Sequence, residues 1–314
     1  MGANHARVLA DSHRARLAIV IDADIERARA LAEPAGALAS TDIADVSRAG
    51  VAIISASTEV HVPLARAVMA QGTPLLVEKP LATDLAGARA LVAESARLGI
   101  PLTCGFVERF NPVLRTALTT LDSEPVHVLA VRHSPRNGPC TTSVVHDMVI
   151  HDLDVACRLA GGSPIASVRA VQVTAPGRPS ADLADATAQF GNGFVATVSG
   201  SRLGHRKVRS YTITTETAVV ELDLIRQDIT LYRHLSHEAL NGDGHGYRFE
   251  TAVDIPFVRR PGEPLALQLD HLCDLVDGTA DADVERASLL PAHELAALVD
   301  AASVEVAQIG AAAA

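Results

Sequence analysis

The chain has 314 residues, of which 48% are hydrophobic and 20% charged, and its formal net charge is −10 at pH 7. This composition is typical of a globular protein and excludes a disordered chain, and the length predicts two domains. The negative charge argues against nucleic acid or an anionic membrane as a partner, because both need a basic surface.

No apolar run in the sequence is long enough for a membrane span, and no signal segment opens the chain, so we expect a cytoplasmic protein. The four cysteines are far apart and form no Cys-x-x-Cys pair, which favours reduced core residues over disulfides or a zinc site. They are Cys104, Cys140, Cys157 and Cys273.

Strands and helices alternate over the first hundred residues. Apolar runs predict strands at residues 16–22, 51–56, 74–78 and 101–106, and the segments between them predict helices at residues 25–33, 60–71 and 84–98. This alternation indicates right-handed βαβ units in a parallel sheet. The sequence therefore predicts an α/β Rossmann-like, NAD(P)-binding domain over residues 1–107.

Ligands of such sheets bind beyond the carboxyl ends of the strands, where Asp22, Ser55 to Thr58 and Glu78-Lys79-Pro80 all fall. An acidic residue at the position of Asp22 would accept hydrogen bonds from the adenosine ribose and repel a 2′-phosphate, which favours NAD over NADP. The alternative role is a helix N-cap, which Asp24 could fill instead. Arg27 is near enough to leave NADP possible.

The glycine fingerprint of a dinucleotide fold is nearly absent. Gly2 lies 20 residues before Asp22, where the last glycine of Gly-x-Gly-x-x-Gly is expected, so the first strand and two glycines would precede Met1. Without that strand, the second and fourth strands lack a partner. We expect either a start at an internal methionine of a longer protein or a truncated chain that binds cofactor poorly.

Lysine is rare in this chain: Lys79 is one of two lysines, against 25 arginines. A chain that uses arginine for surface charge is expected to keep lysine where a compact ammonium with a movable pKa is needed. Lys79 ends an apolar strand, so we interpret it as a chemical residue; chance survival is the alternative.

Strands dominate the second half, which we assign to a second domain over residues 108–314. A helix follows Asn111, and Gly191-Asn-Gly193 predicts a hairpin turn. Consecutive strands with short turns indicate a large, mainly antiparallel sheet in an α+β domain. The strands are expected at residues 126–134, 167–174, 186–190, 194–201, 211–223, 228–234 and 249–258, and two closing helices at residues 264–277 and 291–309.

One helix, near residues 146–160, interrupts these strands and ends at Gly161-Gly162. Asp147, His151, Asp154 and Arg158 are spaced to form one polar stripe on it. A solvated stripe is the simplest interpretation. A carboxylate one turn before an imidazole can also fix the imidazole for proton transfer. A metal site is less favoured, because His-Glu-x-x-His spacing is absent.

Several motifs together resemble the glucose-fructose oxidoreductase and inositol dehydrogenase family. They are Glu78-Lys79-Pro80, Gly105-Phe-Val-Glu-Arg-Phe-Asn-Pro112, Asp147-x-x-x-His151-x-x-Asp154, Asn4-His-Ala-Arg-Val8 and the stretch from Glu285 to His293. The resemblance implies a Rossmann domain followed by an open-sheet α/β domain, often in a homo-oligomer. It also implies NAD(P)-dependent oxidation of a ring hydroxyl in a sugar, nucleotide sugar or cyclitol, and looks most like the branch acting on UDP-N-acetylhexosamines at C3.

The resemblance also implies residue roles. Lys79, Asp147 and His151 match the catalytic residues, with His151 as general base, Asp147 orienting it and Lys79 donating to the reacting oxygen. No metal is implied. Cofactor contacts are expected from Gly2, Asp22, Ser55, Ser57, Thr58, His61, Glu78 and Lys79, and substrate contacts from Arg109, Asn111 and Asp154. For Arg109 and Asn111, helix capping is the alternative.

Two departures from the family pattern leave other functions open. The glycine turn is missing, and Ser55-Ala-Ser-Thr58 replaces the usual Ala-Thr-Pro. A non-catalytic, ligand-binding or regulatory member and a metal hydrolase using the His/Asp helix are the alternatives. A basic run of Arg202, His205, Arg206, Lys207 and Arg209 could hold a diphosphate, although such runs are more often solvated loops.

Overall fold

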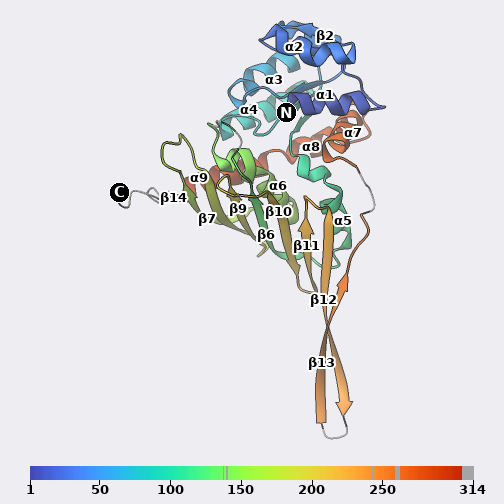
Figure 1. The fold of residues 1–314 in the computed structure, drawn as a ribbon, viewed down its shortest axis with the longest axis vertical. Coiled ribbons are helices and arrows are strands. Elements are labelled where there is room, and N and C mark those ends of the chain that lie inside the picture. The colour runs from blue at the N-terminus through green and yellow to red at the C-terminus, as the bar shows by residue number, and fades with distance from the viewer. Residues whose placement is uncertain (137, 139–140, 242–243, 259–261, 306–314) are drawn as a thin grey trace. The chain divides into compact units, whose positions relative to one another are not determined.

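The computed structural model describes residues 1–136, 138, 141–241, 244–258 and 262–305 (Figure 1). Contacts divide the chain into two units. The first comprises Met1–Phe110 and Gly262–Ala297, and the second takes in the described residues of Asn111–Pro261 and Leu298–Ala314. The predicted division at residue 107 therefore differs from these units in the placement of residues 262–297.

The first unit contains the predicted parallel sheet in two pieces. β1 pairs with β2, and β3, β4 and β5 form a second sheet in that order, with every pair parallel. Within the described chain, no pairing joins β1 to β3, as expected when no strand lies between them. The strands are β1 (Ile19–Ile21), β2 (Leu38–Ser40), β3 (Ala52–Ile54), β4 (Leu75–Val77) and β5 (Leu102–Cys104).

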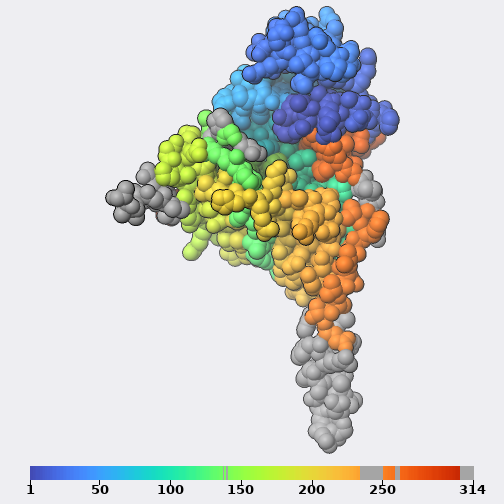
Figure 2. Space-filling view, in the orientation of Figure 1, coloured from blue at the N-terminus to red at the C-terminus, as the bar shows by residue number. Residues whose placement is uncertain are grey.

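Helices flank these strands at the predicted positions, and the residues of α1 and α2 form part of the surface of this unit (Figure 2, blue). The sequence did not predict β2 or α8, because both are too short to show a period. The helices are α1 (Gly2–Asp11), α2 (Ile25–Ala32), α3 (His61–Met69), α4 (Leu85–Leu98), α7 (Pro264–Val276), α8 (Ala282–Ala287) and α9 (Leu290–Ala302).

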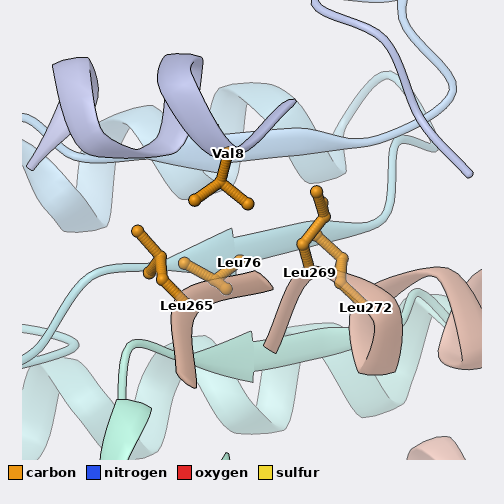
Figure 3. Packing of buried hydrophobic residues seen from close by; sticks show 5 residues of the cluster. All are labelled: Val8, Leu76, Leu265, Leu269 and Leu272. Atoms are coloured by element: carbon orange, nitrogen blue, oxygen red, sulfur yellow. The ribbon is translucent and has the colours of Figure 1, made fainter. Parts of the chain in front are cut away.

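A shared apolar cluster explains why α7 belongs to the first unit (Figure 3). Leu265, Leu269 and Leu272 lie on one face of α7, at helical spacing. They pack with Val8 of α1 and Leu76 of β4, and all five side chains are buried. The hydrophobic face of a helix from the end of the chain thus packs on the sheet formed by β3, β4 and β5.

The second unit is built on one large mixed sheet, in the order β13-β12-β11-β10-β6-β9-β8-β7-β14. The β6–β9 and β7–β14 pairs are parallel, and the other pairs are antiparallel. Its strands are β6 (Pro125–His133), β7 (Ile165–Val173), β8 (Leu183–Phe190), β9 (Val195–Ser201), β10 (Val208–Thr215), β11 (Ala218–Asp223), β12 (Asp228–Asn241), β13 (Gly244–Asp254) and β14 (Ser303–Glu305).

The single strand predicted at residues 211–223 is wrong, because the segment folds back as the β10–β11 hairpin. Thr215 Oγ1 accepts hydrogen bonds from the backbone N–H groups of Thr217 and Ala218, at 3.2 and 3.0 Å, and this closes the turn. The last helix also ends earlier than predicted, where β14 begins. Residues 306–309 of that prediction, and Cys140, lie outside the described residues.

Two helical segments accompany the sheet: α5 (Pro112–Thr120), and a continuous stretch made of a π-helix, Val145–Val149, followed by α6 (Ile150–Leu159). π-helical turns are rare and are frequent at functional sites. Gly161 and Gly162 end the stretch with φ of 62° and 81°, as the sequence predicted. Of the described helices, none is long and apolar enough to cross a membrane.

Gly200 of β9 allows the π-helical turn to approach the sheet. A Cβ atom at Gly200 would overlap Cγ2 of Val149, which is fully buried. We expect Gly200→Ala to lower the free energy of unfolding by about 1–3 kcal/mol through overpacking. Urea unfolding would measure it, with Gly50→Ala as the matched control, because a Cβ at Gly50 meets nothing within 4 Å. Equal losses in both variants would contradict this explanation.

Candidate functional site

Lys79 lies in the turn that follows β4 in the first unit. All three residues of β4 are buried, and the Lys79–Pro80 peptide bond is cis. The backbone N–H of Glu78 donates to the carbonyl of Ile54 at 2.8 Å, which ties the start of the turn to the end of β3. The Lys79 side chain itself is part-buried.

Glu78 is held inside the first unit. Its Oε1 lies 2.7 Å from Nε2 of His5, and its Oε2 accepts from the backbone N–H of Lys79 at 3.3 Å. A Cβ at Gly105 would overlap the Glu78 carboxylate, so glycine is required beside it. Glu78 therefore shapes the turn at Lys79, in agreement with its position in the motif.

His61, one of the residues predicted to contact the cofactor, lies between two backbone carbonyls. The ring is 1% exposed, with Nδ1 at 2.8 Å from the carbonyl oxygen of Pro80 and Nε2 at 3.1 Å from that of Ala56. Both nitrogens thus face backbone carbonyls. His61 joins the Lys79 turn to the loop after β3, so its contacts are those of a positioning residue.

The other residues predicted to hold the cofactor lie at strand ends of the first unit. Asp24 caps α2 by accepting from Glu26 and Arg27, so Asp22 is not needed as the cap. Asp22 is part-exposed, and its Oδ1 accepts from the backbone N–H of Asp24 at 2.9 Å. A contact between Asp22 and the cofactor ribose stays a prediction.

Gly2 and the end of β3 lie together, although the sequence separates them widely. A Cβ at Gly2 would lie 3.0 Å from Oγ of Ser55, and no side chain caps the first turn of α1. Ser57 and Thr58 follow in the same loop. A close backbone approach at a helix N-terminus fits a diphosphate, so these residues fit a dinucleotide.

The second unit holds Asp147, His151 and Asp154 on the π-helical turn and α6. Asp147 and His151 are part-buried, Asp154 is buried, and Arg158 is exposed, so only the last residue of the predicted polar stripe is solvated. Asp147 Oδ2 accepts from Nη2 of Arg202 at 2.9 Å. This bond joins a carboxylate to a guanidinium, so it is charge-assisted and holds the Asp147 side chain in place.

Arg202 separates from the basic run in which the sequence placed it. Its side chain is 5% exposed, and Nη2 also donates to the carbonyl of Thr142 at 2.8 Å. His205, Arg206, Lys207 and Arg209 are exposed. The run therefore divides in two: Arg202 is a buried partner of Asp147, and the other four residues are exposed. For those four, the structure fits a solvated loop, the simpler of the two interpretations.

Arg109 and Asn111, predicted on the substrate side, have structural partners. Arg109 Nη1 donates to Oγ of Ser288 at 2.7 Å, Nη2 donates to the carbonyl of Ser288 at 2.9 Å, and the guanidinium lies 4.8 Å from the Phe106 ring centre. Asn111 Oδ1 accepts from the backbone N–H of Val113 and caps α5. These contacts favour the alternative of a structural role for both.

Glu285 is the ionised centre of a polar cluster around Arg109. Its Oε1 accepts from Oγ1 of Thr103 at 2.6 Å, and its Oε2 lies 3.2 Å from Nε2 of His271. Burial alone would raise the pKa of Glu285, but the hydrogen bond from His271, the charge of Arg109 and the hydrogen bond from Thr103 outweigh burial and lower it.

A lowered pKa means that ionised Glu285 stabilises the fold above its unfolded pKa of about 4.3, and that this stability is lost as the pH falls through the folded value. We therefore expect Glu285→Gln to be less stable than the wild type at neutral pH. The difference should begin to shrink as the pH falls below about 4.3 and should vanish only below the lowered pKa of the folded state, where Glu285 is also neutral. Urea midpoints measured across this range test it; a difference independent of pH would contradict the assignment.

The sequence did not reveal a buried network beneath α6. Arg132 of β6 donates from Nε and Nη2 to the carboxylate of Asp152, at 2.9 and 2.8 Å, and Tyr211 donates to it at 2.6 Å. All three side chains are buried. One sequence feature could have indicated this network: Asp152, next to His151, places a carboxylate on the apolar side of the helix.

Comparison with known proteins identifies the same family that the sequence motifs resemble, in both halves of the chain. The family model described as "Oxidoreductase family, NAD-binding Rossmann fold" matches residues 1–106, and the "GFO/IDH/MocA C-terminal domain" matches residues 117–221. UDP-N-acetylglucosamine 3-dehydrogenase from Acidithiobacillus ferrooxidans is 29% identical over 220 residues, 69% of each chain. Inositol 2-dehydrogenase 2 from Saccharopolyspora erythraea is 33% identical, but over only 51% of each chain.

Solved structures confirm the fold over nearly the whole length. The structure of UDP-N-acetylglucosamine 3-dehydrogenase GnnA from Acidithiobacillus ferrooxidans superposes with a TM-score of 0.83 at 24% identity, covering 96% of this chain and 94% of that one. Both predicted halves are therefore confirmed: a parallel Rossmann-like part and a large, mainly antiparallel sheet. The chain belongs to the Gfo/Idh/MocA family of NAD(P)-dependent oxidoreductases.

Proposed function

We propose that this protein is a dehydrogenase that oxidises a ring hydroxyl of a sugar, nucleotide sugar or cyclitol with NAD(P). The observation that carries this proposal is the Lys79 turn, in which a lysine follows a buried parallel strand and its neighbours Glu78 and Pro80 are held by buried histidines. Membership of an NAD-binding oxidoreductase family supports the reaction class.

The chemistry assigns a role to each residue. Oxidation of a carbinol requires the hydroxyl proton to leave as the hydride leaves carbon, and His151 would take that proton. Asp147, which is held by a hydrogen bond from Arg202, would stabilise the imidazolium. Lys79 would donate a hydrogen bond to the oxygen as negative charge develops on it. Bound NAD would supply the hydride acceptor, held by Gly2, Asp22 and the loop from Ser55 to Thr58.

A UDP-N-acetylhexosamine is our preferred substrate, with inositols as the second choice. The curated relative with the longer match is named as a UDP-N-acetylglucosamine 3-dehydrogenase, and inositol 2-dehydrogenases match over about half of the chain. Asp22 favours NAD over NADP, because a carboxylate at this position repels the 2′-phosphate. Asp154, buried one turn beyond His151, is the remaining candidate for a substrate contact.

The test is a titration of the full-length protein with NADH and NADPH, followed by UDP-sugars and inositols with NAD, measured as NADH formation. We expect tighter binding of NADH than of NADPH, and turnover on a UDP-N-acetylhexosamine. Sugar binding without binding of either nucleotide would replace the enzyme with a non-catalytic, ligand-binding member. Activity that is independent of NAD and abolished by a chelator would support a metal hydrolase instead.

A further inference from the structure

Three histidines from three different elements contact the three residues next to Lys79 in the turn, Glu78, Pro80 and Leu81. His5 of α1 contacts the Glu78 carboxylate at 2.7 Å, His61 of α3 contacts the Pro80 carbonyl at 2.8 Å, and His293 of α9 accepts from the backbone N–H of Leu81 at 3.0 Å. All three histidines are buried: His5 is 6% exposed, His61 1% and His293 4%. All of these residues are in the first unit.

The contacts of His293 fix its tautomer. The backbone N–H of Leu81 can only donate, so Nε2 of His293 must accept from it, and the ring proton must be on Nδ1. Nδ1 donates that proton to the carbonyl of Leu289 at 2.8 Å. The ring also packs against Phe106, with 5.5 Å between ring centres. His293 is thus a defined acceptor placed at the far end of the turn.

Together the histidines fix the backbone on both sides of Lys79. Before it, Glu78 is bonded through its side chain and, at 2.8 Å, through its N–H to Ile54. After it, Pro80 and Leu81 are bonded through one carbonyl and one N–H. A lysine side chain is long and has about 2 kcal/mol of rotamer entropy, so its ammonium is placed accurately only if its backbone is.

We propose that His5, His61 and His293 are positioning residues for Lys79, which set where its ammonium meets the reacting oxygen. This inference rests on the proposed function of Lys79. Apolar residues of the same size could fill these buried positions, but they could not hold the turn, because the Leu81 N–H needs an acceptor and the Pro80 carbonyl needs a donor. Misplacement of a reacting group by about 1 Å can cost a hundredfold in rate.

The matched pair His293→Phe and His293→Gln tests this inference in the full-length protein. Phenylalanine keeps the ring against Phe106 but removes the acceptor, whereas glutamine can place Oε1 near the position of Nε2. We expect His293→Phe to lower kcat by about 10- to 100-fold, with little change in NADH affinity, and His293→Gln to recover most of the loss. Wild-type kcat in His293→Phe would overturn the inference, as would equal losses in both variants.

Two further variants keep the test decisive. If His293→Phe does not fold, the pair His61→Leu and His61→Asn applies the same logic to the Pro80 carbonyl, because asparagine retains a donor near Nδ1. Lys79→Met separates the inference from the proposed function. If Lys79→Met turns over like the wild type, the proposed role of Lys79 fails; if it is inactive while His293→Phe and His61→Leu are unimpaired, only the positioning inference fails.

Discussion

Replacing His151 by asparagine in the full-length protein is expected to lower kcat by about 10²- to 10⁴-fold, the usual contribution of a general base. Asparagine keeps a polar group of similar reach but cannot take a proton. Because the loss falls on the chemical step, NADH affinity should remain that of the wild type. Steady-state NADH formation gives kcat and KM, and fluorescence titration gives the nucleotide affinity.

His146→Asn is the matched control for this experiment. His146 lies on the π-helical turn that directly precedes α6, and its Nε2 contacts Asp300 Oδ2 at 2.7 Å. This contact gives His146 a structural role. We expect His146→Asn to keep the wild-type kcat. A His151→Asn enzyme that turns over normally would show that the general base is elsewhere, and equal losses in both variants would point to distortion of the turn rather than to lost proton transfer.

Much of the fold could be predicted because its strands are either fully buried or cleanly alternating. The continuous apolar run at β4 predicts a strand that is covered on both faces, and all three residues of β4 are buried. The Gly-Asn-Gly sequence predicts the turn of the β8–β9 hairpin. The β10–β11 turn was missed because Thr215 forms it with a hydroxyl rather than with glycine or proline. The placement of α7 was missed because its leucines contact residues far away in the sequence, which no local pattern shows.

Sequence reasoning assigns a specific role most readily where a residue type has few uses, and less readily where it has several. A lysine after a buried strand and a histidine one turn after an aspartate have specific chemistry. Arg109 and Asn111 also suit caps and ion pairs, and the structure gives them such partners. The contacts that His61 and His293 make could not be predicted from sequence, because their partners are backbone atoms of another segment.

The buried ion pair beneath α6 leads to the largest expected effect on stability. Arg132 and Asp152 are 4% and 3% exposed, and three hydrogen bonds of 2.8, 2.9 and 3.1 Å join them. Arg132→Met would leave the Asp152 carboxylate buried without its counter-charge. We therefore expect the free energy of unfolding to fall by about 3–5 kcal/mol, the usual cost of removing one partner of a buried pair. Urea unfolding followed by circular dichroism measures it.

The double variant Arg132→Met/Asp152→Leu distinguishes a lost charge balance from lost packing. Removal of both charges leaves no uncompensated carboxylate, so the double variant should be more stable than Arg132→Met alone, although it carries one more substitution. Additive losses would instead show that the two side chains act by packing only. Since Asp152 directly follows His151, recovery of stability without recovery of kcat would show that the ion pair also orients the α6 segment that carries the general base.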